Sequence, residues 1–94
     1  MKKNKPYAQA TTVRIADALA DQNRQAILRL LGQRDWCVCE IVPKLRLPQN
    51  LVSHHLAVLR RAKLVRFRRE GLRRVYALER PTLLRFVSAI NYGR

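Results

Sequence analysis

Two cysteines, Cys37 and Cys39, are the side chains of this sequence best suited to bind a soft metal ion. Thiolates prefer soft ions, and two thiolates within reach of one ion chelate it. Residues i and i+2 of a regular helix point about 200° apart, so both can hold one ion only if a helix is unwound there. The residues leave three alternatives open: an ion-binding pair, two inert packed thiols, or a pair that responds to oxidation.

The net charge indicates a polyanionic partner. The chain has 94 residues, and its 20 Lys and Arg against 6 Asp and Glu give a formal net charge of +14. DNA or RNA is the commonest partner of such a protein. Two classes fit: a DNA-reading regulator, and an architectural or RNA-binding protein without an inducer. We expect no enzyme, because the sequence has no acid pair in a likely cleft, no Gly-rich phosphate loop and no activated nucleophile.

A predicted helix that opens at Pro48 carries the side chains best suited to read bases. Its apolar stripe has the i, i+3, i+4, i+7 spacing of a core face, and it consists of Val52, His55, Leu56 and Leu59. His55 is therefore expected in the core. Short polar side chains near the start of such a helix reach base edges in the major groove. We predict base or phosphate contacts from Gln49, Asn50, Ser53 and His54.

A run of basic residues follows the predicted reading helix. Residues 60–74 contain eight Lys and Arg and a single acid, Glu70. Like charges at this density repel one another unless an anionic partner is present. We expect them to hold DNA phosphates or to enter the minor groove beside the reading helix. The residues assigned to DNA in this run are Arg60, Arg61, Arg66, Arg68, Arg69, Arg73 and Arg74.

The remaining elements must position these groups. We predict a first helix over 8–20, with Val13, Ala16 and Ala20 at helical spacing. A second helix is capped by Asp21 and ends near Gly32, where a helix C-terminus favours a positive φ. A short helix is expected over 36–45. Because Pro43 is tolerated only in a first turn, this helix either starts late, near Val42, or is irregular around the cysteines.

The C-terminal third predicts a β-hairpin and a last helix. Residues 64–68 and 74–78 are β-branched and aromatic runs around Glu70-Gly71. Residues 81–91 form the last helix, and its apolar side chains predict packing against something outside its own domain. The order α-α-α-α-β-β-α is that of a winged helix-turn-helix: a mainly α fold with a small β-hairpin. A chain this small favours a homodimer.

Length and composition predict one domain over residues 1–94, with residues 1–7 as a basic, flexible arm. No apolar run approaches the roughly 20 residues of a membrane span, and no signal-type segment follows the N-terminus. We therefore expect a cytoplasmic protein that does not contact a membrane. In that reducing compartment we expect Cys37 and Cys39 to be free thiols or metal ligands rather than a bridge, which their spacing makes geometrically awkward.

The sequence resembles the ArsR/SmtB metalloregulatory repressors over about residues 14 to 88. The most specific segment is Val52-Ser53-His54-His55-Leu56, and Cys37-Val38-Cys39-Glu40 and Arg69-Glu70-Gly71 add to it. The resemblance implies a homodimeric repressor that binds a palindromic operator, dimerises through its first and last helices and leaves the DNA when an inducer binds. The chain departs from the family at Pro48, Arg46 and Leu51, where Ser, Gly and Thr are usual.

The resemblance also implies that the inducer is a thiophilic ion bound by Cys37 and Cys39, with no cofactor required. Arsenite or antimonite is the first expectation; cadmium, lead or thiol oxidation are the alternatives. As(III) and Sb(III) favour three thiolates, and Val42 stands where members of the family commonly supply a third cysteine. The family's second site, made of Asp and His on the last helix, is absent, because residues 81–94 contain no His, Asp or Glu.

Overall fold

The computed structural model describes residues 6–91, and for residues 6–11, 90 and 91 it describes the backbone alone. Its elements are α1 (Pro6–Leu19), α2 (Gln22–Gln33), β1 (Trp36–Cys37), α3 (Val38–Leu45), α4 (Gln49–Arg61), β2 (Val65–Glu70), β3 (Arg73–Leu78) and α5 (Arg80–Asn91). The predicted winged helix-turn-helix order is confirmed. Of the predicted arm, residues 1–5 lie outside the described residues, and residues 6 and 7 begin α1. No helix in the described part of the chain could span a membrane.

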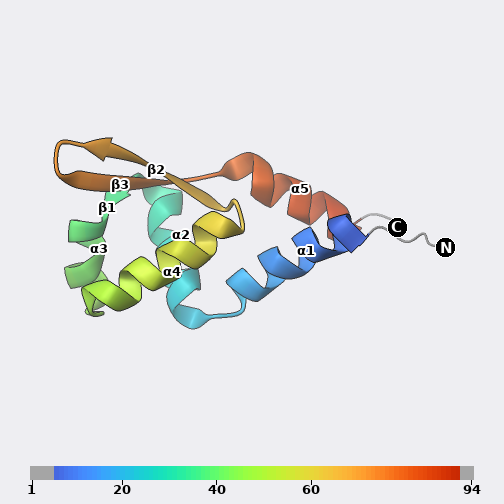
Figure 1. The fold of residues 1–94 in the computed structure, drawn as a ribbon, viewed down its shortest axis with the longest axis horizontal. Helices are drawn as coiled ribbons and strands as arrows, with labels where there is room; N and C mark the ends of the chain where they lie inside the picture. The colour runs from blue at the N-terminus through green and yellow to red at the C-terminus, as the bar shows by residue number, and fades with distance from the viewer. Residues whose placement is uncertain (1–5, 92–94) are drawn as a thin grey trace.

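The molecule has two ends of different construction. At one end, the helix-turn-helix α3–α4 packs beneath an antiparallel sheet, and at the other end α1 and α5 lie apart from it (Figure 1). The sheet has the order β1-β3-β2. The core lies between α2, α4 and the sheet, where burying apolar surface is the main stabilising term. Its fully buried side chains are Ile27, Leu31, Ile41, Val52, Leu56, Leu59 and Leu64.

The third strand, β1, was not predicted. It contains two residues only and pairs with β3, Trp36 opposite Tyr76 and Cys37 opposite Val75. The predicted hairpin is confirmed as β2 and β3, in which Phe67 lies opposite Tyr76. Gly71 has φ +63 in the turn between them, a conformation that favours glycine.

Two predictions about the first helices are wrong in part. Among residues 12–19 of α1, the buried residues are Ile15 and Ala18. Val13 is 65% exposed and Ala16 and Ala20 are exposed as well, so the predicted stripe faces outward. Gly32 lies inside α2 and has no positive φ, because the helix continues to Gln33. The predicted N-cap is confirmed: the Asp21 carboxylate accepts a hydrogen bond from the Arg24 backbone N–H at 3.0 Å.

The short third helix does not start late. α3 begins at Val38, directly after the cysteine that caps it, and Pro43 lies inside it. Proline has no N–H to donate to the carbonyl four residues earlier, and α3 ends only two residues later, at Leu45. Its C-cap, Arg46, has φ 57, the left-handed conformation that favours the glycine usual there.

Candidate nucleic-acid interface

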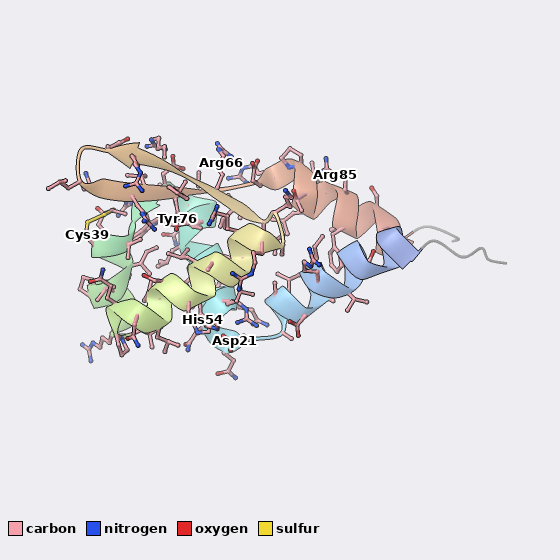
Figure 2. All side chains as sticks on the ribbon, viewed as in Figure 1. Asp21, Cys39, His54, Arg66, Tyr76 and Arg85 are labelled. Atoms are coloured by element: carbon pink, nitrogen blue, oxygen red, sulfur yellow. A yellow bond between two sulfur atoms is a disulfide. The ribbon has the colours of Figure 1, made fainter. Side chains whose placement is uncertain are left out.

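The polar face of α4 is free of the core, as predicted. Gln49, Asn50, Ser53 and His54 are all exposed, while the predicted stripe of Val52, His55, Leu56 and Leu59 is buried without exception. Figure 2 shows His54 on the side of α4 that faces away from the sheet. The helix therefore presents short polar side chains to solvent on a rigid element, the arrangement that a major-groove reading helix requires.

His55 and Arg24 fasten α4 to the first two helices. The Arg24 guanidinium donates to His55 Nδ1 at 3.1 Å and to the Ala18 carbonyl at 2.7 Å. Because a guanidinium only donates, His55 Nδ1 must accept, which makes the ring neutral with its proton on Nε2. Burial lowers the pKa of His55, in agreement with a neutral ring. The backbone N–H of Arg24 in turn lowers the pKa of Asp21, which lies 3.9 Å from Nε2.

The arginines of the wing, which is the β2–β3 hairpin, fall into two groups that the sequence did not separate. Arg66 pairs with Glu79 at 3.2 Å, and Arg68 pairs with Asp35 and Glu70, each at 2.7 Å. The hydrogen bond to Asp35 is the main cause that raises the pKa of Arg68. These two cations already have acidic partners within the chain, so a phosphate contact from either one has to compete with those ion pairs.

The second group has little internal compensation. Arg69 and Arg74 lie directly opposite each other in the hairpin and have no acidic partner among the described residues. Arg73 has one distant partner, Glu40 at 3.8 Å. Like charges at opposed positions of a hairpin repel, so an external anion stabilises them. The Arg74 and Arg60 guanidiniums both approach the Phe67 ring, at 5.3 and 5.2 Å from its centroid.

A groove of about 750 Å³ brings part of the predicted site together. On one wall stand Gln49, Ser53 and Arg60 of α4, and on the other Arg69, Arg73 and Arg74 of the wing. We call this the reading groove. The remaining predicted residues do not line it: Asn50, His54 and Arg61 lie elsewhere on α4, and Arg66 and Arg68 elsewhere on the wing. Leu72, at the wing tip and fully exposed, borders the reading groove and was not predicted.

The cysteines also line the reading groove, but not as predicted. Cys37 and Cys39 form a disulfide, so the expectation of free thiols is wrong for this structure. The spacing permits the bridge because Cys37 is the last residue of β1 and the N-cap of α3, not part of a helix. Cys37 is buried and Cys39 exposed. Figure 2 shows Cys39 beside the wing, at the end of the molecule remote from α1 and α5.

Glu40 connects the cysteines to the wing. Its carboxylate accepts the Cys37 backbone N–H at 2.9 Å, the main cause of its lowered pKa, and pairs with Arg34 at 3.4 Å. The Cys37 Sγ accepts the Cys39 backbone N–H at 3.1 Å, which completes a capping box. Glu40 was not predicted as a site residue, although a cap residue followed three positions later by Glu is the signature of this motif.

Comparisons with known proteins agree with this geometry. Residues 21–66 match the family model described as bacterial regulatory protein, arsR family. The chain is 37% identical over 76 residues to the arsenic resistance transcriptional regulator ArsR1 of Pseudomonas putida; the match covers 80% of this chain and 59% of that protein. The chain spans less than two thirds of the length of the curated relatives it matches, 65% and 46% for the first two.

Two solved structures resemble the whole fold. Reduced HlyU from Vibrio cholerae is 30% identical, with a TM-score of 0.74 over 95% of this chain and 96% of that one. The homodimeric winged helix-turn-helix DNA-binding domain of Mb0332 from Mycobacterium bovis, a possible ArsR-family regulator, is 27% identical, with a TM-score of 0.83 over 96% of this chain and 84% of that one. Residues 21–66, which include the helix-turn-helix and the polar face of α4, therefore match the arsR family of bacterial regulatory proteins, and they lie within a winged helix-turn-helix fold.

Proposed function

We propose that the chain is a transcriptional repressor that binds an operator in double-stranded DNA as a homodimer. The observation that carries the proposal is the reading groove, in which polar side chains of α4 face three wing arginines, two of which, Arg69 and Arg74, have no acidic partner among the described residues. Base contacts from α4 supply specificity, and phosphate contacts from Arg60, Arg69 and Arg74 supply most of the affinity. A two-fold dimer binds two half-sites, so the operator is expected to be palindromic.

The exposed apolar residues support a dimer through α1 and α5. Val13 of α1 is 65% exposed, and Leu84 and Val87 of α5 are 67% and 47% exposed. In the part of the chain with described side chains, the only other exposed large hydrophobic is Leu72 at the wing. Large apolar side chains that cluster on two terminal helices are typical of an association surface. The similar domain from Mycobacterium bovis is homodimeric.

The inducer that we propose is a thiophilic ion, arsenite or antimonite first, bound by reduced Cys37 and Cys39. Because Cys37 precedes α3, the two sulfurs approach each other without unwinding a helix, and the unwinding step expected from the spacing is not needed. No group of three His, Cys, Asp or Glu among the described residues provides a complete ligand set. We propose hydroxide, an added thiol or another non-sulfur group as the third ligand. ArsR1, which is similar to this chain, is an arsenic resistance regulator.

The disulfide favours oxidation as a second candidate signal. Metal binding needs thiolates, so the bridged pair is the form that cannot bind the ion. Ion binding and oxidation both change the Cys37 sulfur, which caps α3. Cys37 is linked to the wing through Glu40, which accepts the Cys37 backbone N–H and pairs with Arg73. We infer that the cysteine pair acts on DNA binding by moving the wing relative to α4.

One titration separates these candidates. Fluorescence anisotropy with the protein's own promoter and with random DNA is measured for reduced protein, oxidised protein, and reduced protein with arsenite, antimonite, cadmium or lead. We expect reduced protein to prefer the promoter and one ion to release it. Release on oxidation alone favours the redox candidate. Equal affinity for both DNAs favours an architectural protein, and release by arsenite from a C37S/C39S variant contradicts the assigned site.

A further inference from the structure

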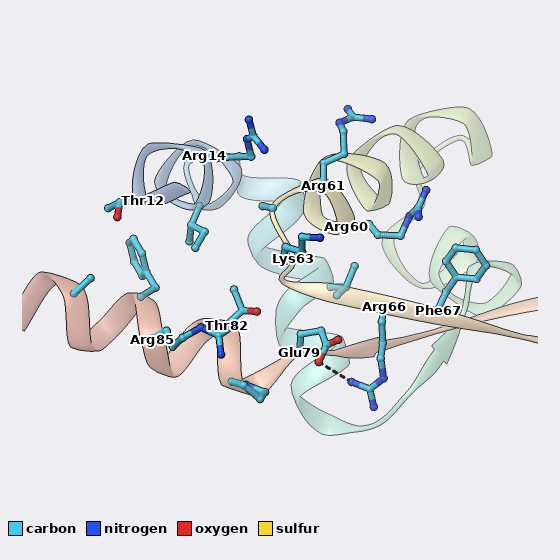
Figure 3. Close-up of a pocket in the computed structure, with 16 residues that line it drawn as sticks. Thr12, Arg14, Arg60, Arg61, Lys63, Arg66, Phe67, Glu79, Thr82 and Arg85 are labelled. Carbon is cyan, nitrogen blue, oxygen red and sulfur yellow. Dashed lines mark hydrogen bonds and ion pairs between the residues drawn. The ribbon is translucent and has the colours of Figure 1, made fainter. Parts of the chain in front are cut away.

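A second cavity lies at the other end of the molecule from the cysteines. It has a volume of about 910 Å³ and opens between α1 and α5 on one side and the C-terminus of α4 with the start of β2 on the other (Figure 3). Its apolar lining includes the buried side chains of Ile15 and Val65 and the half-buried ring of Phe86. This volume is within the range of small-molecule sites.

The rim of the cavity is strongly cationic. Six basic side chains line it, namely Arg14, Arg60, Arg61, Lys63, Arg66 and Arg85, against one acid, Glu79. Glu79 is paired with Arg66 at 3.2 Å, as the dashed line in Figure 3 marks. Arg14, Lys63 and Arg85 have no acidic partner among the described residues. Several uncompensated cations around an apolar lining attract an anion with an apolar body.

Lys63 occupies a backbone position that favours glycine. It follows the C-terminus of α4 with φ 65, and the Leu64 N–H donates to the Leu59 carbonyl at 3.0 Å, the six-to-one bond of a Schellman turn. A side chain with Cβ is strained at this φ, and glycine is the usual residue. Figure 3 shows Lys63 between Arg61 and Thr82, at the centre of the lining residues. A lysine at this place is costly for the fold but supplies a cation to the cavity.

The apolar surface that we assign to the second copy lies on other faces of the same helices. At about 100° per residue, Leu84 of α5 points about 160° away from Phe86, which lines the cavity. On α1, Val13 is separated by a similar angle from Ile15, which also lines the cavity. A second copy seated on Val13, Leu84 and Val87 therefore leaves the cavity accessible.

We propose that this cavity binds a small anionic amphiphile, with a carboxylate held near Lys63 and Arg85 and an apolar body against Ile15 and Phe86. A fatty acid and an aromatic carboxylic acid share this chemistry. Arg60 and Arg61 belong both to the cavity rim and to the last turn of α4. If the proposed DNA binding holds, the bound anion competes with DNA for these cations and lowers the affinity for DNA. Bound DNA then lowers the affinity for the anion by the same factor.

Calorimetric titration of the reduced 94-residue chain with decanoate tests the site. Decanol and decyltrimethylammonium serve as matched probes without charge and with the opposite charge. The protein is held at a concentration at which sedimentation shows the dimer. We expect decanoate to bind at least tenfold more tightly than decanol, and the cation not to bind. Equal binding of decanoate and decanol overturns the anion site, and no binding of decanoate by the dimer overturns the proposal.

Two variants separate a binding role of Lys63 from a structural one. Lys63→Gly removes the cation and relieves the backbone, so we expect decanoate affinity to fall about tenfold while resistance to urea stays equal or increases. Arg29→Gln makes the same change in charge at an exposed α2 residue outside the cavity, and its affinity for decanoate should stay unchanged. Unchanged decanoate affinity in Lys63→Gly overturns the proposal.

A DNA competition separates this inference from the proposed function. Decanoate at a fixed concentration near its Kd for the wild-type chain is expected to weaken promoter binding of the wild-type chain more than promoter binding of Lys63→Gly. If the chain binds decanoate but no DNA, the cavity site stands and the repressor proposal fails. If it binds the promoter but not decanoate, the repressor proposal stands and the cavity proposal fails.

Discussion

Replacing Arg74 with glutamine removes a wing cation that lines the reading groove and has no acidic partner among the described residues. Each phosphate contact contributes about 0.9 to the slope of log affinity against log salt. A homodimer has two wings, so the variant should lower the magnitude of the slope by about 1.8. At 0.1 M salt, one lost contact per wing corresponds to a loss of about eightfold per protomer.

Arg68→Gln is the matched control, on the neighbouring strand of the same hairpin. Its guanidinium is held by Asp35 and Glu70, each at 2.7 Å, so it is expected to release no counterions on binding DNA. Anisotropy titrations at four or more salt concentrations give both slopes. The Arg68 variant should keep the wild-type slope. Equal decreases in the two variants would refute the distinction between paired and unpaired arginines.

Three further predictions concern the fold that carries the site. Burial holds the pKa of His55 below the ordinary 6.5, so below that pH the unfolded chain binds more protons than the folded chain. The free energy of unfolding should therefore fall as the pH drops from about 6.5. A His55→Asn variant should lose most of this pH dependence in urea titrations. Leu56→Ala should lower the free energy of unfolding by about 2–5 kcal/mol in the same assay, since Leu56 is fully buried; a loss below about 1 kcal/mol contradicts its place in the core. Leu84→Asp should shift sedimentation from dimer to monomer with little change in thermal midpoint measured at monomer concentrations; an unchanged dimer excludes this face.

Sequence periodicity predicted the elements whose packing is set by local pattern. The stripe on α4 has the exact spacing of a core face, and all four of its residues are buried, including the polar His55. The Asp21 cap and the hairpin follow from residue types that act over three to six positions. These features carry the reading helix and the wing, so most of the DNA-binding framework could be derived from the sequence.

The features that were missed depend on partners distant in sequence. β1 has two residues and exists only because β3 pairs with it, so no periodic signal reveals it. Its presence in turn moves Cys37 out of the helix and allows the bridge to Cys39. Similarly, Arg68 and Arg74 are indistinguishable in a basic run, and only the approach of Asp35, 33 residues away, neutralises Arg68. Charge composition therefore indicates the proposed class of partner, but it does not reveal which of the described cations lack an acidic partner.

The central claim is that the exposed face of α4, of which Gln49 and Ser53 line the reading groove, reads bases in the major groove of DNA. It is tested most directly by the ratio of affinities for promoter and random DNA, measured at physiological salt with reduced protein and with a Gln49→Ala/Ser53→Ala variant. Each lost base contact should lower the difference in binding free energy between promoter and random DNA by about 1–3 kcal/mol, and the affinity for random DNA should stay unchanged because the wing arginines are intact. A wild-type ratio near one, or an equal loss on both DNAs, would contradict the claim.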